Sequence, residues 1–341
     1  MLRQQDVGHR IVVRRIVGIR EGRPLFSDAL GELVELTETH LTLSTAQGQL
    51  RVPVAQVHRA KRVPPTRRPT AAAVVALERA ADEAWPAPSR GQLGDWLLRA
   101  ADGWTGRANS ALPIGDPDRP LPAAVDAVER WYAERGQPPI INTPLPLAAP
   151  VGAELDARGW AARPPVLVQT APLPLQPSAA SAPPDNAPVA RRTPATAGQA
   201  GTAVADADAV VELAAAPSAE WLAVAAGRKG GLPEAARHVL TAVGQVRFAH
   251  VYVDGTLLAV GRGTVTGQGR WLGLSLIEVL PVARRQGLAS RVIHELAAWG
   301  MSAGATHAFL QVEQHNTAAV ALYQRLGFAT HHTYLTRVAP H

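Results

Sequence analysis

The run of residues 276–298, LIEVLPVARRQGLASRVIHELAA, combines residue types that bind anions. A strand pattern ends at Val279, Pro281 interrupts it, and a glycine-containing loop leads into an amphipathic helix. The first N–H groups of a helix lack partners within the helix, and the helix dipole adds partial positive charge at that end. Arg284 and Arg285 contribute two guanidinium groups that suit phosphate. The order of elements therefore predicts a phosphate-binding loop.

The strand end next to Pro281 offers a second kind of contact. Proline has no N–H and breaks the ladder of a sheet, so neighbouring backbone groups are left to bond an extended ligand that carries amides. The short pattern Arg-x-x-Gly-x-Ala, at Arg284, Gly287 and Ala289, is expected nearly once by chance in a chain this rich in Arg, Gly and Ala. Its position between a strand and a helix is what makes it informative.

An alternating α and β pattern surrounds this loop and predicts a domain over residues 204–341. Asp254-Gly255 is a hairpin turn signal between two of its strands. The order of elements predicts an α+β fold with a mixed central sheet flanked by helices. Helices are predicted near 207–225, 233–243 and 288–300 and over TAAVALYQRLG, and strands at QVRFAHVYV, TLLAVGRGTV, RWLGLSLIEVL, AFLQVEQ and FATHHTYLT.

Residues 1–65 have a different pattern, that of a small all-β domain. HRIVVRRIV, GELVELT, HLTLST and QLRVPVAQV are short and rich in β-branched or alternating apolar residues, which favours strands. Ala46-Gln47-Gly48 is a hairpin-type connection between the last two. Short strands with so few intervening residues are typical of a small barrel. The DALGELVEL segment and the hairpin resemble a Tudor-like barrel.

A third segment and a linker lie between these domains. Residues 70–170 are predicted to begin with a helix capped by Thr70, and to contain a hairpin around Asp102-Gly103 and a helix near 122–135. The strand–DG–strand pattern, and the segment ARGW that parallels the later RLGF, indicate a degenerate copy of the last domain. Residues 171–203 are dominated by proline and alanine and are predicted to be a disordered linker.

The composition narrows the chemistry. The 341 residues contain no cysteine, which excludes disulfides, thiolate nucleophiles, zinc–thiolate sites and iron–sulfur clusters. No run approaches the roughly 18 apolar residues of a membrane span, and MLRQQDVGHR lacks the apolar core of a secretory signal. The expectation is a cytoplasmic protein. No metal is expected, because metal-ligand spacing is missing around His294, His307, His331 and His332.

Positive charge is concentrated in the first domain. Residues 1–70 carry twelve basic and six acidic side chains, whereas residues 71–341 carry twenty-two of each. A basic segment attracts nucleic acid with a steep salt dependence, but the segment 59–68 has no interleaved aromatic residues. A solvated connector between domains is therefore the preferred interpretation, and nucleic-acid binding is the alternative. The basic residues of the segment are Arg59, Lys61, Arg62, Arg67 and Arg68.

Taken together, VLPVARRQGLASRVIHELAAW and the following LQVEQHNTAAVALYQRLGF closely resemble the acetyl-CoA-binding region of the GNAT N-acetyltransferases. The resemblance is strong over residues 245–337 and looser over 204–244. The whole layout, with the barrel, DWLLRAADGWTGRANSALP and WYAERG ahead of it, is similar to an actinobacterial GNAT subfamily with an N-terminal Tudor-like domain. The resemblance implies the GNAT fold and acetyl-CoA as the acyl donor.

The resemblance also implies roles for particular residues. Loop N–H groups would hold the pyrophosphate of coenzyme A, and the strand end at Glu278–Leu280 would bond the pantetheine amides. Val279 N–H would bond the thioester oxygen. The base varies in position within this family, and Glu278 is a candidate for it, directly or through water. Tyr323, two helical turns after Asn316 on the same face, would protonate the departing thiolate. The implied cofactor-binding residues are Val279, Leu280, Arg284, Arg285, Gln286, Gly287, Leu288, Ala289 and Asn316.

Each assignment has a plainer alternative. Arg284 and Arg285 are also explained as solvated loop residues. Tyr323 is also explained as a core aromatic, and Glu278 as a surface carboxylate at a strand end. Glu313 is a rival base.

The predicted activity is transfer of an acetyl group from acetyl-CoA to a primary amine of an unidentified acceptor, either a small molecule or a protein. The alternative is a catalytically vestigial protein that binds acyl-CoA or associates with nucleic acid. Two interpretations also remain for four residues of the third segment, which either line the acceptor pocket or form a buried hairpin core. They are Trp96, Trp104, Arg107 and Asn109.

Overall fold

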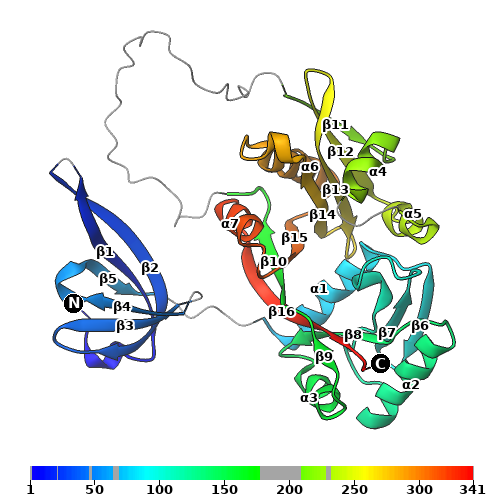
Figure 1. The fold of residues 1–341 in the computed structure, drawn as a ribbon, viewed down its shortest axis with the longest axis horizontal. Coiled ribbons are helices and arrows are strands. Elements are labelled where there is room, and N and C mark those ends of the chain that lie inside the picture. Colours follow the sequence, from blue (N-terminus) through cyan, green and yellow to red (C-terminus); the bar gives the residue numbers. More distant parts are fainter. Residues whose placement is uncertain are drawn as a thin grey trace. The chain divides into compact units, whose positions relative to one another are not determined.

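The computed structural model describes residues 2–20, 22–45, 48–63, 69–176, 209–227 and 232–340. The chain divides into two compact units, residues 1–68 and 69–341, and Figure 1 shows the elements of both. The predicted linker begins too early, because Ala171 and Pro172 belong to a strand of the second unit; from residue 177 onward it lies outside the described residues. Across the described ranges, every helix is too short or too polar to cross a membrane.

The first unit is an antiparallel sheet in the order β4-β3-β2-β1-β5. Its core contains Ile11, Val13, Leu33, Leu41 and Leu43, all of which are almost completely buried. The alternation of apolar and polar residues along the strands places these side chains on one face of the sheet. The strands are β1 (Arg10–Arg20), β2 (Arg23–Leu36), β3 (His40–Thr45), β4 (Gly48–Pro53) and β5 (Val57–Arg62).

This sheet is not closed, which corrects the predicted barrel. β2 pairs with β1 along most of its length and with β3 along its last residues, and its register with β3 shifts between Leu33 and Glu35. Such a shift bends a strand and curves the sheet. Within the described residues no ladder joins β4 to β5: a short 3-10 turn at Val54–Gln56 connects them, and they remain the two edges. The likeness to a Tudor-like domain stays a prediction.

The second unit combines a large sheet, a separate hairpin and helices. The sheet strands are β8 (Ile140–Leu145), β9 (Ala161–Ala162), β10 (Val166–Pro172), β11 (Ala209–Ala214), β12 (Val246–Val253), β13 (Thr256–Thr266), β14 (Trp271–Val279), β15 (His307–Glu313) and β16 (Ala329–Val338). The hairpin strands are β6 (Ser89–Leu93) and β7 (Trp96–Ala100). The helices are α1 (Ala71–Glu83), α2 (Leu121–Ala133), α3 (Ala149–Ala157), α4 (Ala219–Ala226), α5 (Glu234–Thr241), α6 (Leu288–Ser302) and α7 (Thr317–Arg325).

One sheet runs through the second unit in the order β11-β12-β13-β14-β15-β10-β16-β8, with β9 also paired to β16. β14 and β15 are parallel, and the other neighbouring strands are antiparallel. β10, which comes before the predicted linker, lies between β15 and β16. The predicted segments 70–170 and 204–341 therefore share one sheet. The mixed sheet confirms the α+β fold class, and the degenerate copy stays a prediction.

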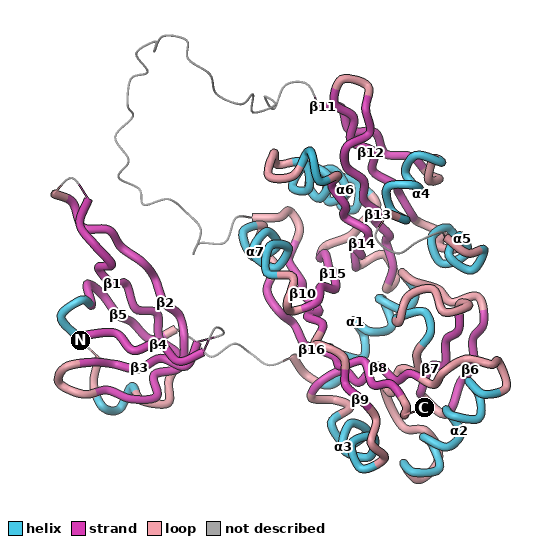
Figure 2. The backbone as a smooth tube through the Cα atoms, in the orientation of Figure 1, coloured by secondary structure: helices cyan, strands magenta, loops and turns pink. Residues whose placement is uncertain are grey.

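Helices cover both faces of this sheet (Figure 2). On one face, α6 packs Val292 and Leu296 against β12, β13 and β14. On the other face, α4 and α5 enclose Phe248 of β12 with Trp221 and Val239. α1 lies on this second face, where it packs against β10 and β16. As predicted, Thr70 caps α1, because its hydroxyl accepts a bond from Ala73 N–H.

The helix predicted at 207–225 is partly wrong. Its first part is the strand β11, and helix α4 begins only after Pro217. Ser218 then caps α4 by accepting a bond from Trp221 N–H at 3.0 Å. The β-branched pair Val210-Val211 favours a strand, and the proline separates that strand from the helix.

The hairpin predicted around Asp102-Gly103 is wrong in position: the observed hairpin lies before β7 and not after it. The observed hairpin joins β6 and β7 through Gly94-Asp95. Asp102-Gly103 instead begins a loop, and the Asn109 side chain holds this loop by accepting bonds from Ala101 N–H and Gly103 N–H. An asparagine that bonds nearby backbone stabilises such a turn without a second strand.

Candidate functional site

The site begins where the parallel strands β14 and β15 separate. They pair as far as Leu274 and Leu310, and beyond that point β14 continues to Val279 without β15 beside it. A bulge changes the direction of β14. Leu276, at the bulge, has a φ of 53°, and the register with β13 shifts at this position. Positive φ is strained for leucine, and strain of this kind is concentrated at functional sites. The bulge therefore turns the end of β14 toward an open edge.

Backbone groups of Val279 face this open edge. In an antiparallel pair, every second residue turns its N–H and C=O toward the neighbouring strand. Leu280 N–H donates to the Leu258 carbonyl at 2.9 Å, so Leu280 turns toward β13 and Val279 turns away. Arg284 Nε donates to the Val279 carbonyl at 3.3 Å. Val279 N–H is thus placed to meet a ligand, and Leu280 N–H is not.

The loop after β14 presents N–H groups at the start of α6. Arg285 and Gly287 have positive φ values of 67° and 82°. Left-handed residues between right-handed ones turn successive N–H groups to one side and form an anion-binding concavity. Gly287 is the N-cap and makes no side-chain capping bond, so Leu288, Ala289 and Ser290 keep their N–H groups for a ligand. A Cβ added at Gly287 would meet no described atom within 4 Å, so the space beside it is open.

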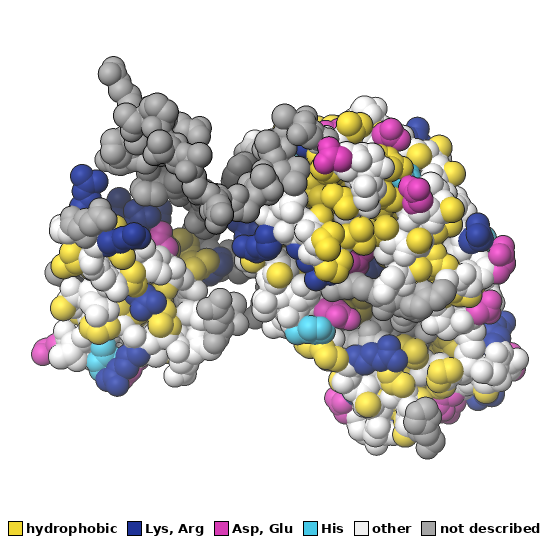
Figure 3. Space-filling model, turned by 45° about the horizontal axis from the view of Figure 1, so that its top comes forward, with side chains coloured by type: hydrophobic (Ala, Val, Ile, Leu, Met, Phe, Trp, Pro, Cys, Tyr) yellow, Lys and Arg dark blue, Asp and Glu magenta, His cyan; other side chains and the backbone are white. Residues whose placement is uncertain are grey.

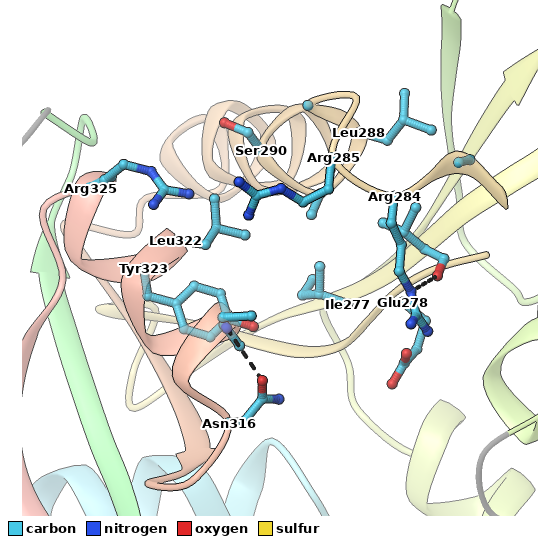
Figure 4. Close-up of a pocket in the computed structure, with 16 residues that line it drawn as sticks. Ile277, Glu278, Arg284, Arg285, Leu288, Ser290, Asn316, Leu322, Tyr323 and Arg325 are labelled. Atoms are coloured by element: carbon cyan, nitrogen blue, oxygen red, sulfur yellow. Dashed lines mark hydrogen bonds between the residues drawn. The ribbon is translucent and has the colours of Figure 1, made fainter. Parts of the chain in front are cut away.

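The open edge and the loop line one cavity of about 420 Å³. Its walls come from β14, from the loop and first turn of α6, and from α7. Figure 4 shows Arg285 and Arg325 pointing toward one another across it, whereas Arg284 turns toward β14. The predicted residues that line this cavity are Glu278, Val279, Arg284, Arg285, Gly287, Leu288, Ala289, Asn316 and Tyr323.

Two predicted residues lie outside this lining, and seven lining residues were missed, of which Ser290 and Arg325 are the polar ones. Leu280 and Gln286 do not line the cavity. Ser290 belongs to the first turn of α6, so the helix-start rule that selected Ala289 applies to it as well. Arg325 comes from a different helix, and only the packing of α7 beside the loop brings it to the site.

A second cavity, of about 460 Å³, adjoins the first. Its walls come from β14, β15 and β16 and from residues 105–107 and 163–166 of the earlier segment. Both of the segments that share the large sheet therefore contribute to it. The residues that line both cavities are Ile277, Glu278, Asn316, Ala319 and Tyr323.

Tyr323 lies where the two cavities meet. Its ring packs edge-on against Phe328, with 6.0 Å between ring centres, and the residue is only 9% exposed. Burial, with a further contribution from the charge of Glu278, raises the pKa of the Tyr323 phenol to about 12. The phenol therefore keeps its proton at neutral pH, and Figure 4 shows its ring directed into the cavity.

The two candidate bases are placed differently. Glu278 is half-buried and lines both cavities. Glu313 lines the second cavity only, its side chain is 63% exposed, and it pairs with His315 at 3.2 Å. The geometry favours Glu278, because a base must reach the place where the two ligands meet.

The acceptor candidates and the histidines also have definite places. Arg107 lines the second cavity. Trp96 and Trp104 are buried in apolar clusters, which supports the core interpretation for them. Each histidine named above has a nearby partner: His332 Nε2 is 2.6 Å from Glu78 Oε1, His331 contacts His332, His294 contacts Ser290 and His307 contacts Thr306.

Asn316 is the N-cap of α7, since its Oδ1 accepts a bond from Ala319 N–H at 3.3 Å. Asn316→Ala should lower the free energy of unfolding by about 1 kcal/mol, because the first turn of α7 loses its cap. Asn316→Ser should recover most of this loss. Urea denaturation of the three proteins measures the difference, and equal stability of Asn316→Ala and the unchanged protein would contradict a capping role.

Comparisons with known proteins identify relatives of this chain. A GCN5-related N-acetyltransferase from Kribbella flavida has the same fold, with a TM-score of 0.54 and 18% identity, over 81% of this chain and 97% of that one. "Probable histone acetyltransferase Rv0428c" of Mycobacterium tuberculosis is 30% identical over 97% of this chain and 95% of its own length. "Uncharacterized N-acetyltransferase YobR" of Bacillus subtilis is 30% identical over 76% of this chain and 98% of its own length.

The fold and the two adjoining cavities define an enzyme of the GCN5-related N-acetyltransferase class. Residues 71–336 match the family described as "Probable histone acetyltransferase Rv0428c C-terminal". The chain belongs to this family.

Proposed function

We propose that the protein transfers an acetyl group from acetyl-CoA to a primary amine, with coenzyme A in the first cavity and the amine in the second. The observation that carries this proposal is the meeting of the two cavities at Tyr323 and Glu278. A ligand in each cavity would bring its reacting end to these two side chains.

The first cavity suits coenzyme A in its chemistry. The N–H groups at the start of α6, with Arg285 and Arg325, suit the diphosphate. The outward-facing carbonyl of Val279, which can accept a second bond beside the one from Arg284, suits an amide N–H of an extended arm. When bound, acetyl-CoA supplies an acetyl group activated as a thioester.

The residues at the junction have separate tasks. Val279 N–H is placed to donate to the carbonyl oxygen of the acetyl group, where negative charge develops during attack. Glu278 accepts a proton from the amine, directly or through water, so that the nitrogen lone pair is free to attack. Tyr323 gives its phenolic proton to the departing sulfur.

Release of coenzyme A in the presence of amines tests the proposal. Because the chain has no cysteine, a thiol-reactive dye reports only the coenzyme A that is released. The panel should contain simple alkylamines, amino acids, polyamines and basic peptides. We expect amine-dependent release with an acetylated product of matching mass. An enzyme that binds acetyl-CoA but releases no coenzyme A with any member would be vestigial.

Glu278→Gln is expected to lower kcat/KM by about fivefold near pH 6.5, where the base is most needed. The loss should shrink as the pH rises, because a growing fraction of the free amine is then already neutral. Rates of coenzyme A release from pH 6 to about pH 9.5 measure this change.

Glu313→Gln is the matched control. Glu313 is exposed and absent from the first cavity, so this variant should keep the unchanged pH profile. A pH-independent loss in Glu278→Gln, together with a pH-dependent loss in Glu313→Gln, would reassign the base to Glu313.

The first part of the basic segment 59–68 is not a connector, because Arg59, Lys61 and Arg62 belong to the edge strand β5. For the rest of the segment we propose a connecting role. Arg62 pairs with Asp6 at 2.7 Å, which neutralises one of the five charges, and residues 64–68 lie outside the described residues. On the face seen in Figure 3, Lys and Arg side chains of this unit are spread out rather than gathered in one patch. Both observations favour a connector over a nucleic-acid site.

A further inference from the structure

We propose that the acceptor amine carries an oxyanion, a carboxylate or a phosphate, and that the wall of the second cavity around Arg107 binds it. This inference rests on the proposed function and names the class of acceptor. Two guanidinium groups of the second unit have no oppositely charged partner among the described residues.

Arg107 presents a guanidinium group that no described acidic side chain neutralises. It belongs to a short 3-10 turn, Arg107–Asn109, and its Cζ lies 5.5 Å from the ring centre of Trp85. Its Nε is buried and has no hydrogen-bond partner in the described part of the chain. The nearby helix α1 carries three acids, and each has another partner. Asp82 is paired with Arg90 and Arg99. Glu78 is paired with His332, and Glu83 accepts a bond from Gly267 N–H. A buried donor left without a partner costs free energy, and an oxyanion would supply one.

A second guanidinium group lies behind the same wall. Arg262 of β13 is fully buried, and its Cζ is 5.3 Å from the ring centre of Trp85. It donates to three backbone carbonyl groups, which carry no net charge. Burial, with the nearby charge of Arg107, lowers the pKa of Arg262 to about 9, so it remains protonated at neutral pH. Trp85 and Ser275, which both contact this residue, line the second cavity.

Two acids, Glu278 and Glu313, line the second cavity together with two arginines, and Glu313 is 63% exposed and paired with His315. Glu278 lines both cavities and so lies at their junction, where the amine must react. Arg107 and Arg163 line the second cavity only. An acceptor with its amine at the junction and an oxyanion farther in would match both signs of charge. A second cationic group on the acceptor would instead face Arg107, and like charges discriminate against such ligands.

The size of the cavity indicates a small acceptor. Its volume of about 460 Å³ falls within the range of sites for small molecules. Planar guanidinium groups match carboxylate and phosphate equally well in shape. The cavity wall would therefore bind the paired oxygen atoms that both anions carry. The proposed class is therefore a small amine that carries an oxyanion.

Calorimetry with four related amines tests this proposal. Butylamine, putrescine, γ-aminobutyrate and aminopropyl phosphate differ mainly in the group opposite the amine, and coenzyme A in place of acetyl-CoA keeps the complex unreactive. We expect at least one of the two anionic amines to bind about tenfold more tightly than butylamine and putrescine. The tighter of the two identifies the anion. Equal binding of all four amines, or no binding of either anionic amine, would overturn the proposal.

Variants locate the preference in the protein. Arg107→Met keeps most of the apolar stem and should remove the tenfold preference, measured as the ratio of the affinities for the anionic amine and for butylamine. Arg163→Met should reduce the preference about threefold, and because Arg163 is exposed this variant tests the proposal even if Arg107→Met does not fold. Arg135→Met is the control: Arg135 also packs on a tryptophan, Trp131, with its Cζ 3.7 Å from the ring centre, but it does not line the cavity.

Failure of this inference differs from failure of the proposed function. A preference that survives Arg107→Met would overturn the inference even if every amine is acetylated. If the preference behaves as expected but no coenzyme A is released from acetyl-CoA, the inference stands and the proposed transfer is wrong.

Discussion

Tyr323→Phe should lower kcat by about 10²–10⁴, the usual contribution of a general acid. Phenylalanine keeps the ring and its packing against Phe328, but it has no proton to give to the departing sulfur. Acetyl-CoA affinity should change by less than about threefold, because the phenol acts on the sulfur only as the bond breaks. Coenzyme A release gives kcat, and calorimetry gives the affinity. Turnover at the unchanged rate, with chemistry limiting, would show that water protonates the sulfur.

The pKa of Tyr323 fixes the pH dependence of this step. A phenol with a pKa of about 12 stays protonated below that pH, so kcat should not fall through Tyr323 ionisation between neutral pH and about pH 10. A thiol has an ordinary pKa of about 8.5, which makes proton transfer from this phenol unfavourable in water. The burial that raises the pKa of the phenol also raises the pKa of a thiol in the same cavity. The pKa of the phenol and that of the thiol therefore lie closer together in the cavity than the pKa of this phenol and that of a thiol in water.

Tyr132→Phe is the matched control for Tyr323→Phe. Tyr132 is fully buried, its hydroxyl donates to the Arg99 carbonyl at 2.8 Å, and it lines neither cavity. This variant should lose about 1 kcal/mol of stability with that hydrogen bond and keep its kcat.

Gly287→Val should weaken acetyl-CoA binding at least tenfold, or by about 1.4 kcal/mol. Gly287 has a φ of 82°, which a β-branched residue adopts only with strain, and its side chain would enter the open space beside the loop. Loss of the backbone approach to the diphosphate is the physical cause. Calorimetric titration with acetyl-CoA measures the effect, and unchanged affinity would remove the cofactor site from this loop.

Gly304→Val separates backbone strain from ligand exclusion. Gly304 follows the other end of α6, has a φ of 97°, and an added Cβ there would have only the Gly269 carbonyl oxygen near it, at 3.9 Å. This variant should lose stability for the same backbone reason and keep its acetyl-CoA affinity. An equal loss of affinity in both variants would mean that α6 is disturbed as a whole.

The parts of the site that depend on neighbouring residues could be predicted from the sequence. The strand end, the glycine-containing loop and the start of α6 follow one another directly, so the elements themselves hold the information. The same holds for Asn316 and Tyr323 on α7, since helical spacing alone relates them. These predicted residues line one cavity.

Other parts depend on pairing over long distances. Val279 and Leu280 differ only in which side their N–H groups face, and that depends on the register between β13 and β14. The bulge at Leu276 sets this register, and no residue type marked it. Arg107 reaches the second cavity only because the earlier segment packs beside β14 and β16. A local sequence pattern predicts neither the register between β13 and β14 nor the packing of the earlier segment beside β14 and β16.

The position of β10 has a consequence for synthesis of the chain. β8, β9 and β10 pair with β15 and β16, which are synthesised much later than they are. At ribosomal rates of about 5–20 residues per second, the early strands wait roughly 10–30 s with exposed edges. Unpaired strand edges recruit other strands, so this interval is when the nascent chain is most exposed to aggregation. Nascent-chain chaperones would act mainly before β16, at Ala329–Val338, leaves the ribosome.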